Sequence, residues 1–451
     1  AYNVAVGYNA GENVTTGTNN TLIGGLAGDA LTTGSNNIAI GKSALSAEDG
    51  HGHNIAIGAN ALAGLNAGTD AYNIAIGSSA GGSISTGAAN TIIGGLAGDA
   101  LTTGGNNIAI GHAALSSADA DARNVAIGVR ALEDQNAGNN TYNVAIGYEA
   151  GKQVTTGIQN TILGASSGDA LTSGQFNVAM GYGALGSATD TDQSVAIGHG
   201  ALTALDYSGD SNNTAVGHNA GASATTAIQS TFIGAFAGDA VTIGLANTAV
   251  GYNALSEEDE HGYNTAVGHG ALKIQNAGAN AYNVAVGASA GLSVTTGTQN
   301  VLIGGFAGDA LTTCTRNVAV GHRALSSETG AGQITAIGHD ALKNYNKGSG
   351  DGNTDAVGYH AATQMTTGNG VIIGALAGNA LTTGTNNVVL GNNALGNEDT
   401  GSKNIAIGNN ALENLNYDGD AYNVAIGHNA GRQVTTGVQN TIIGGLAGDE
   451  L

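Results

Sequence analysis

The sequence contains nearly the same stretch twice, 70 positions apart. Residues 20–41 read NTLIGGLAGDALTTGSNNIAIG, residues 90–111 read NTIIGGLAGDALTTGGNNIAIG, and the stretch returns near 160, 230, 300, 370 and 440. Within it lies a shorter repeat: an Asn, an aliphatic residue, a small residue, an aliphatic residue and a Gly, as in NIAIG at 37–41. A repeat this short cannot form a core alone, so its recurrence predicts copies stacked on one another.

The spacing of the glycine that ends this run, the motif glycine, defines the organisation of the chain. Its successive intervals are 17, 17, 17 and 19, which together make one block of period 70, with one slip to 20 and 16 around Gly358. The repeats from Gly7 to Gly444 predict one continuous array over residues 1–451. Its blocks cover about 1–70, 71–140, 141–210, 211–280, 281–351 and 352–420, with a partial block at 421–451.

The residues before the motif glycine predict a short strand. β-Branched residues alternate with small ones there, which is typical of a strand with one buried face. We expect the aliphatic residue directly before the glycine, such as Val6, Ile23 or Ile40, to lie on that buried face. The predicted fold class is therefore all-β, a parallel β-solenoid of about 26 coils, each coil being one repeat. The Asn at the start of each run is expected to form an amide ladder or to bond its own backbone.

Composition excludes several other classes of protein. The chain has 77 Gly but no Pro and no Gly-X-Y period, so it is not collagen-like, and 41% hydrophobic residues argue against disorder. A net charge of −22 makes nucleic acid a poor partner, and no apolar run is long enough to insert into a membrane. No catalytic constellation is visible, so we expect no enzyme activity. The lone Cys314 replaces a turn glycine and cannot form an intrachain disulfide.

The run NVAIG-x-x-A, repeated in register along nearly the whole chain, resembles the head repeats of trimeric autotransporter adhesins. Related repeats occur in trimeric phage tail fibres. The resemblance implies a left-handed β-roll, three chains packed side by side, and an extracellular location on a cell surface or virion. The repeats of this chain are longer than usual for the family, which implies larger loops.

The middle residue of the predicted strand, two before the motif glycine, is also apolar. Ser, Thr or Lys would serve if it faced water, but it is Ala in most repeats and a large residue in every fourth. An apolar second face needs a second partner, so we expect this column to form the interface of a homotrimer. The predicted interface residues are Leu22, Ala39, Ala56, Ile92, Ile162, Phe232, Leu302, Ile372 and Ile442.

Three residues are candidates for metal binding. Asp29 lies in a stretch like a calcium-binding nonapeptide, but its copies recur only once in each block, so it could share an ion only with partner chains. The alternative is a turn Asp that bonds the backbone. His51 and His53 have the spacing with which similar phage fibres bind iron, or else are exposed loop residues. We expect no cofactor, with a structural calcium ion as the alternative. Acidic clusters such as Glu48-Asp49 are expected to form a solvated edge or to bind divalent ions loosely.

Tyr and His recur directly after the motif glycine and form a candidate recognition stripe for sugars or protein surfaces, or simply shield turns. Its members are Tyr8, His112, Tyr148, His199, His218, His269, His322 and His428. The predicted function is a structural or adhesive fibre segment, homotrimeric, that attaches to a cell-surface glycan or protein. The alternative is a structural spacer or self-assembling extracellular filament with recognition carried elsewhere.

Overall fold

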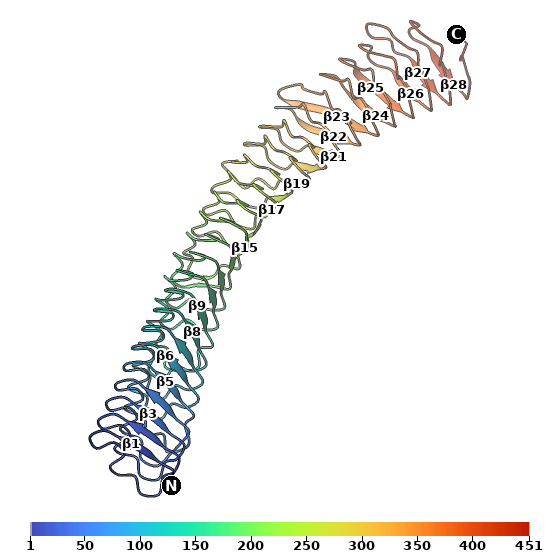
Figure 1. Ribbon diagram of the computed structural model, residues 1–451. Coiled ribbons are helices and arrows are strands. Elements are labelled where there is room, and N and C mark those ends of the chain that lie inside the picture. The colour runs from blue at the N-terminus through green and yellow to red at the C-terminus, as the bar shows by residue number, and fades with distance from the viewer. Residues whose placement is uncertain (1, 451) are drawn as a thin grey trace. The chain divides into compact units, whose positions relative to one another are not determined.

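The computed structural model describes residues 2–450, which form short strands and turns without a helix (Figure 1). Of the 28 described strands, 26 belong to a parallel ladder in which each coil of chain contributes one strand. This confirms the predicted β-solenoid of about 26 coils. Its handedness and the trimer stay predictions.

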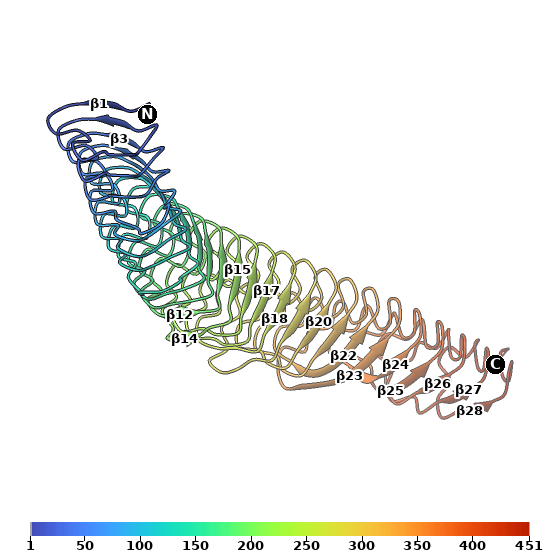
Figure 2. The same cartoon turned by 90° about the horizontal axis from the view of Figure 1, so that it is seen from below.

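The chain divides into two compact units, Ala1–Gln229 and Ser230–Leu451, in each of which successive strands stack side by side (Figure 2). The strands of the first unit are β1 (Val4–Val6), β2 (Thr21–Ile23), β3 (Ile38–Ile40), β4 (Ile55–Ile57), β5 (Ile74–Ile76), β6 (Thr91–Ile93), β7 (Ile108–Ile110), β8 (Val125–Ile127), β9 (Val144–Ile146), β10 (Thr161–Leu163), β11 (Val178–Met180), β12 (Thr191–Asp192), β13 (Val195–Ile197), β14 (Gly209–Asp210) and β15 (Thr214–Val216). Strands β12 and β14 pair with each other outside the main ladder.

The second unit follows the same plan. Its strands are β16 (Thr231–Ile233), β17 (Thr248–Val250), β18 (Thr265–Val267), β19 (Val284–Val286), β20 (Val301–Ile303), β21 (Val318–Val320), β22 (Gly332–Ile337), β23 (Asp351–Val357), β24 (Asn369–Ile373), β25 (Thr385–Leu390), β26 (Ile405–Ile407), β27 (Val424–Ile426) and β28 (Thr441–Ile443).

The strand register follows the predicted glycine spacing. In the first unit Ala39 pairs with Ala56 across a short repeat, and Ala56 pairs with Ala75 across the longer one. In the second unit Ala336 pairs with Ala356 and Ala356 pairs with Ile372, so the slip near Gly358 keeps these pairs in register, while the longer strands nearby carry register shifts between Gly332 and Ile334 and between Asn369 and Gly370. Length differences between repeats are therefore taken up in the loops, while the strand register is kept.

The predicted orientation of the strands was wrong. The middle residue of each strand after β1 points into the coil and is buried, as Leu22 and Ala39 are, whereas the aliphatic residue before the glycine faces outward, with Ile23 37% exposed. The buried Asn at the start of the run, such as Asn37, shares the inward face with the middle residue because side chains alternate along a strand. The narrow interior accepts Ala in most coils, and the larger Ile and Val side chains are left outside.

Large and small side chains alternate inside the coil so that volumes match. Leu22 lies between Gly11 and Gly28, each of which stands four residues after the motif glycine of its coil. A Cβ at Gly11 would be 2.6 Å from a Leu22 methyl carbon, and a Cβ at Gly28 would be 2.8 Å from the other. In each full block, two of the other three coils instead carry a buried Leu at that position, as in Leu45 and Leu62. The block of four coils is thus the repeat length of a packing pattern that fills the core at native density.

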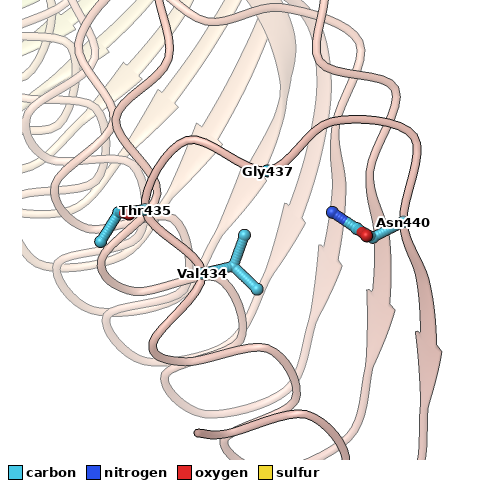
Figure 3. A pocket seen from close by; sticks show the side chains of 4 residues that line it. All are labelled: Val434, Thr435, Gly437 and Asn440. Atoms are coloured by element: carbon cyan, nitrogen blue, oxygen red, sulfur yellow. The ribbon is translucent and has the colours of Figure 1, made fainter. Parts of the chain in front are cut away.

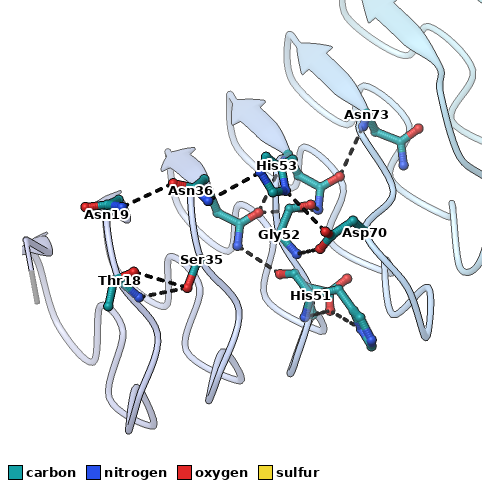
Figure 4. A network of polar contacts seen from close by, with 12 residues as sticks. Thr18, Asn19, Ser35, Asn36, His51, Gly52, His53, Asp70 and Asn73 are labelled. Carbon is teal, nitrogen blue, oxygen red and sulfur yellow. Dashed lines mark hydrogen bonds and ion pairs between the residues drawn. The ribbon is translucent and has the colours of Figure 1, made fainter.

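The buried Asn column ties neighbouring coils together. The Asn37 backbone N–H donates to Asn20 Oδ1 (2.9 Å), Asn37 Oδ1 accepts from the Asn54 N–H (3.0 Å), and Asn37 Nδ2 donates to the His51 carbonyl (3.0 Å). The same ladder reaches Asn73 in the next coil (Figure 4). The amides therefore bond mainly to the backbone of the adjacent coil, where they satisfy buried groups that the short strands leave unpaired.

The motif glycine is required by close approach of the backbones. Gly24 has a φ of +133°, and a Cβ there would lie 2.5 Å from the Gly41 carbonyl oxygen of the next coil. A side chain would separate the coils at this point, which explains why glycine ends every repeat.

Candidate functional site

The nine residues predicted as an oligomer interface lie inside the chain. Ile442 is 8% exposed and the other eight have no exposed surface in the single chain. A side chain enclosed by its own coil cannot contact a partner, so this assignment was wrong. The reason is the orientation of the strand, and the surface available to a partner is the opposite face.

That opposite face, here called the sheet face, is formed by four residues of each coil. They stand five, three and one before the motif glycine and one after it, so in the coil of β9 they are Tyr142, Val144, Ile146 and Tyr148. The two tyrosines are 48% and 56% exposed, and the two aliphatic residues between them are partly exposed. Most coils present aliphatic or Thr side chains in the centre, with the exposed Asp355 an exception, and polar, aromatic or small residues at the margins.

The aliphatic centre of the sheet face continues from coil to coil. In the second unit the residue before the motif glycine is exposed at Ile233, Ile303 and Ile373, and partly exposed in the coils between them. In the first unit the same holds around Ile76 and Leu163. Because monomeric soluble proteins rarely expose a long apolar column of this kind, it is a candidate interaction site.

The predicted Tyr and His stripe forms one margin of the sheet face. In some pairs of successive coils that both carry a ring, the rings stack, with centroids 5.4 Å apart for Tyr182–His199, 5.1 Å for His199–His218 and 5.5 Å for Tyr252–His269. Where rings stack, neighbouring rings cover their faces, so their edges and polar tips face solvent.

The predicted calcium candidate, Asp29, lies in a turn. Burial raises the pKa of the carboxyls at the equivalent positions Asp99, Asp169, Asp239 and Asp309, against the lowering effect of each residue's own backbone N–H. Among residues 2–450, the clusters of three or more metal-ligating side chains do not include Asp29. Asp29 Oδ1 is buried without a hydrogen-bond partner among the described residues, so the turn hydrogen bond and the calcium site both stay predictions.

The structure separates the two predicted histidine ligands (Figure 4). His51 Nδ1 lies 3.3 Å from Glu48 Oε1, whereas His53 Nδ1 lies 3.4 Å from Asp70 Oδ2 and its ring stacks on Tyr72 at 5.0 Å. His51 clusters instead with Glu48 and Asp49. Pairing His51 with His53 by spacing alone therefore grouped the wrong side chains.

The structure forms two further clusters of this kind. Glu258, Asp259 and His261 repeat the first cluster, and the shared pattern Glu-Asp-x-His-Gly could have revealed it. The other joins His322, His339 and Asp340. Its buried carboxylate is already compensated by cations, since Arg323 Nε lies 3.2 Å and Lys343 Nζ 3.7 Å from the Asp340 oxygens.

A pocket of about 210 Å³ lies in the coil that precedes β28 and is lined by Val434, Thr435, Gly437 and Asn440 (Figure 3). The equivalent glycine of an earlier coil, Gly157, is covered by the Gly174 carbonyl of the next coil, whereas atoms near Gly437 come from its own coil. The lining side chains carry no charge and no metal-ligating group, so the pocket offers no chemistry of its own.

No helix capable of crossing a bilayer occurs in the described part of the chain. No family model matches the sequence, and neither the curated proteins nor the solved structures gave a match.

Proposed function

We propose that this chain is a structural segment of an extracellular fibre and that it assembles with copies of itself, as a homotrimer, through the sheet face. The observation that carries the proposal is the column of aliphatic side chains directly before the motif glycine, which is partly exposed on a single chain. Burying such a surface releases about 25 cal/mol for each Å² removed from water. The resemblance to trimeric adhesin and phage-fibre repeats supplies the expected number of chains. No catalytic role is part of the proposal.

Charge supports association through this face alone. The acidic loops place Asp49, Glu257 and Glu260 in solvent, in a chain of net charge −22. Like charges on the loops repel neighbouring assemblies, and charged side chains protect strand edges against sideways pairing. The sheet face carries few charges, so it is where two copies can approach at least electrostatic cost.

An adhesive role is the second candidate. The margins of the sheet face expose tyrosines, among them Tyr72 and Tyr182, and Tyr combines an apolar body with a polar tip suited to glycans or protein surfaces. Many weak copies along one assembly would bind by avidity. A structural spacer without recognition is the alternative, and glycan or cell binding by the assembled protein would separate the two.

The test is the mass of the chain in solution, measured by light scattering after size-exclusion chromatography. A trimer has three times the single-chain mass of 43.8 kDa. The variant Leu163→Lys, Ile303→Lys, Ile443→Lys places charges on the sheet face and should yield folded monomers. The matched control, Thr156→Lys, Thr296→Lys, Thr436→Lys, adds the same charges seven residues earlier, at exposed loop positions outside the sheet face.

Retention of the trimer in the control and its loss in the first variant, with unchanged circular dichroism, would support the proposal. A parent chain that is monomeric at all concentrations would refute self-association. A trimer that survives all three sheet-face lysines would assign assembly to another surface.

A further inference from the structure

Two loops of the solenoid carry the same unusual cluster. Glu48, Asp49 and His51 form it in the first unit, and Glu258, Asp259 and His261 form it in the second. In each cluster, one ligand atom from each of the three side chains lies within 4.8 Å of the others. Each unit thus forms the same arrangement separately.

The geometry of the two clusters is nearly identical. The backbone N–H of the His donates to Oε1 of the Glu at 2.9 Å in the first loop and 3.1 Å in the second. The ring Nδ1 lies 3.3 Å from the same oxygen in both. The Glu side chains have no exposed surface, whereas the His rings are partly open, at 29% and 20% exposure. A buried carboxylate therefore faces an imidazole that solvent can reach.

Each cluster has a buried carboxylate oxygen without a partner. Oε2 of Glu48 and of Glu258 accepts no hydrogen bond, and His261 Nδ1 also lacks one. Burial raises the pKa of Glu258. Among the groups that lower it, the backbone N–H of Ala277 in the next coil has the smallest effect, and it makes no hydrogen bond to Oε2. A buried carboxylate in this state is costly unless a cation compensates it.

Two sister loops provide an internal comparison because they have the Glu but lack the His. There Oε2 of Glu328 accepts from the Lys347 N–H at 2.8 Å, and Oε2 of Glu398 accepts from the Tyr417 N–H at 3.1 Å. Oε2 of the Glu is thus unpartnered in the two loops that carry His and hydrogen-bonded in these two sister loops. The His and the free Glu oxygen therefore occur together in these four loops, which also differ at other positions, such as Thr329 after Glu328.

We propose that each of the two loops binds one Zn²⁺ ion through the carboxylates of Glu48 and Asp49 with the His51 imidazole, and through Glu258, Asp259 and His261. Imidazole with carboxylates is a ligand set for Zn²⁺, whereas Ca²⁺ prefers oxygen ligands alone. Two ligand atoms about 2.0–2.1 Å from a tetrahedral zinc lie about 3.4 Å apart. This is close to the 3.3 Å between the His Nδ1 and the Glu Oε1 in both loops. The fourth position stays open to water or to a group from another molecule.

The same reasoning excludes other groups of the chain. The dication would meet Arg323 and Lys343 at the His322, His339 and Asp340 cluster, which disfavours binding there. His53 takes no part, because Tyr263 stands at its position in the second loop. The sites do not depend on the proposed function, since both are complete within one chain.

The experiment is isothermal titration of the full chain, without a histidine tag and freed of metal, with Zn²⁺ and separately with Ca²⁺. We expect His51→Ala with His261→Ala to bind two Zn²⁺ fewer per chain than the parent, and each single variant one fewer. The matched control His53→Ala should bind as the parent does. Excess Ca²⁺ should not compete, which separates the sites from diffuse binding to the acidic surface.

A second pair of variants guards against effects on folding. Glu48→Gln with Glu258→Gln keeps the shape and the Oε1-type acceptor but removes the carboxylate, and should also lose both ions while the circular dichroism is unchanged. Zn²⁺ should raise the melting temperature of the parent and not of either double variant. Equal zinc stoichiometry in the parent and both double variants, or no binding by the parent, would overturn the proposal.

Discussion

Leu22 occupies the space beside Gly11 that a side chain at Gly11 would need: a Cβ there would be 2.6 Å from Leu22 Cδ1. Gly11 and Leu22 belong to successive coils. Gly28 belongs to the same coil as Leu22, and a Cβ there would lie 2.8 Å from Leu22 Cδ2. One large side chain therefore fills the room left by two glycines. This relationship accounts for the large residue in every fourth coil, which contributes to the core and not to an interface.

Gly28→Ala should destabilise the chain strongly. The new methyl would collide with Leu22 at a backbone φ of +56°, where non-glycine residues are disfavoured by about 1–2 kcal/mol, and overpacking adds about 1–3 kcal/mol. The control is Gly25→Ala in the same coil, whose Cβ would find its nearest atom at 3.9 Å. Guanidinium denaturation followed by circular dichroism compares them, and equal stability of the two variants would contradict the packing pattern.

Asn37→Ala should cost more than Asn13→Ala. Removing the Asn37 amide leaves the buried Asn54 N–H and the His51 carbonyl without partners, and each such group costs about 1–3 kcal/mol. Asn13 also donates to a carbonyl, of Asp29, but is exposed, so water replaces its bond. Thermal melts of the two variants are the measurement, and a smaller loss for Asn37 would show that the column does not hold the coils.

Stability should rise as the pH falls from neutral toward about 4. Burial raises the pKa of Asp99, Asp169, Asp239 and Asp309 in the folded state above the usual value near 3.9. The folded chain then holds these protons more tightly than the unfolded chain does. The resulting stabilisation is fully present below the pKa of the aspartates in the unfolded state, and it is lost as the pH rises through their pKa in the folded state.

Asp239→Asn should flatten this dependence, and Asn379 already stands at the equivalent position of a later block. Asp355→Asn, at an exposed position, controls for the loss of one charge. Melting temperatures between pH 4 and pH 8 test both. An Asp239→Asn curve that is parallel to that of the parent would rule out this aspartate as a source of the effect.

Cys314 should resist thiol reagents in the native chain. It is 1% exposed, its Sγ donates to the Thr329 carbonyl, and burial raises its pKa to about 11, so little thiolate forms at pH 8. Denaturant should release full reactivity. A cysteine at the exposed Ser349 in a Cys314→Ala background is the positive control, and rapid native labelling of Cys314 would mean that the coil opens locally.

The sites could be predicted only in part, because clusters depend on which loops meet. His51 and His53 are two residues apart, yet one contacts Glu48 in its own loop and the other contacts Asp70 in the next coil. The Glu-Asp-x-His pattern is present in the sequence. Its meaning depends on the contrast with the sister loops of Glu328 and Glu398, where backbone N–H groups of the next coil bond the second carboxylate oxygen.

The sequence by itself determined the number of coils, their register and the position of the slip near Gly358, because a glycine ends every repeat where two backbones approach too closely for a side chain. Only the tertiary structure decided which face of the strand turns inward. A period-two pattern with apolar residues on both faces does not distinguish the two orientations of the strand. From the pattern alone we predicted that the Leu22 face lies outside the coil, whereas Leu22 is buried. The interior width resolved it, since the coil has room for Ala in most turns and for a large residue only where glycines make space.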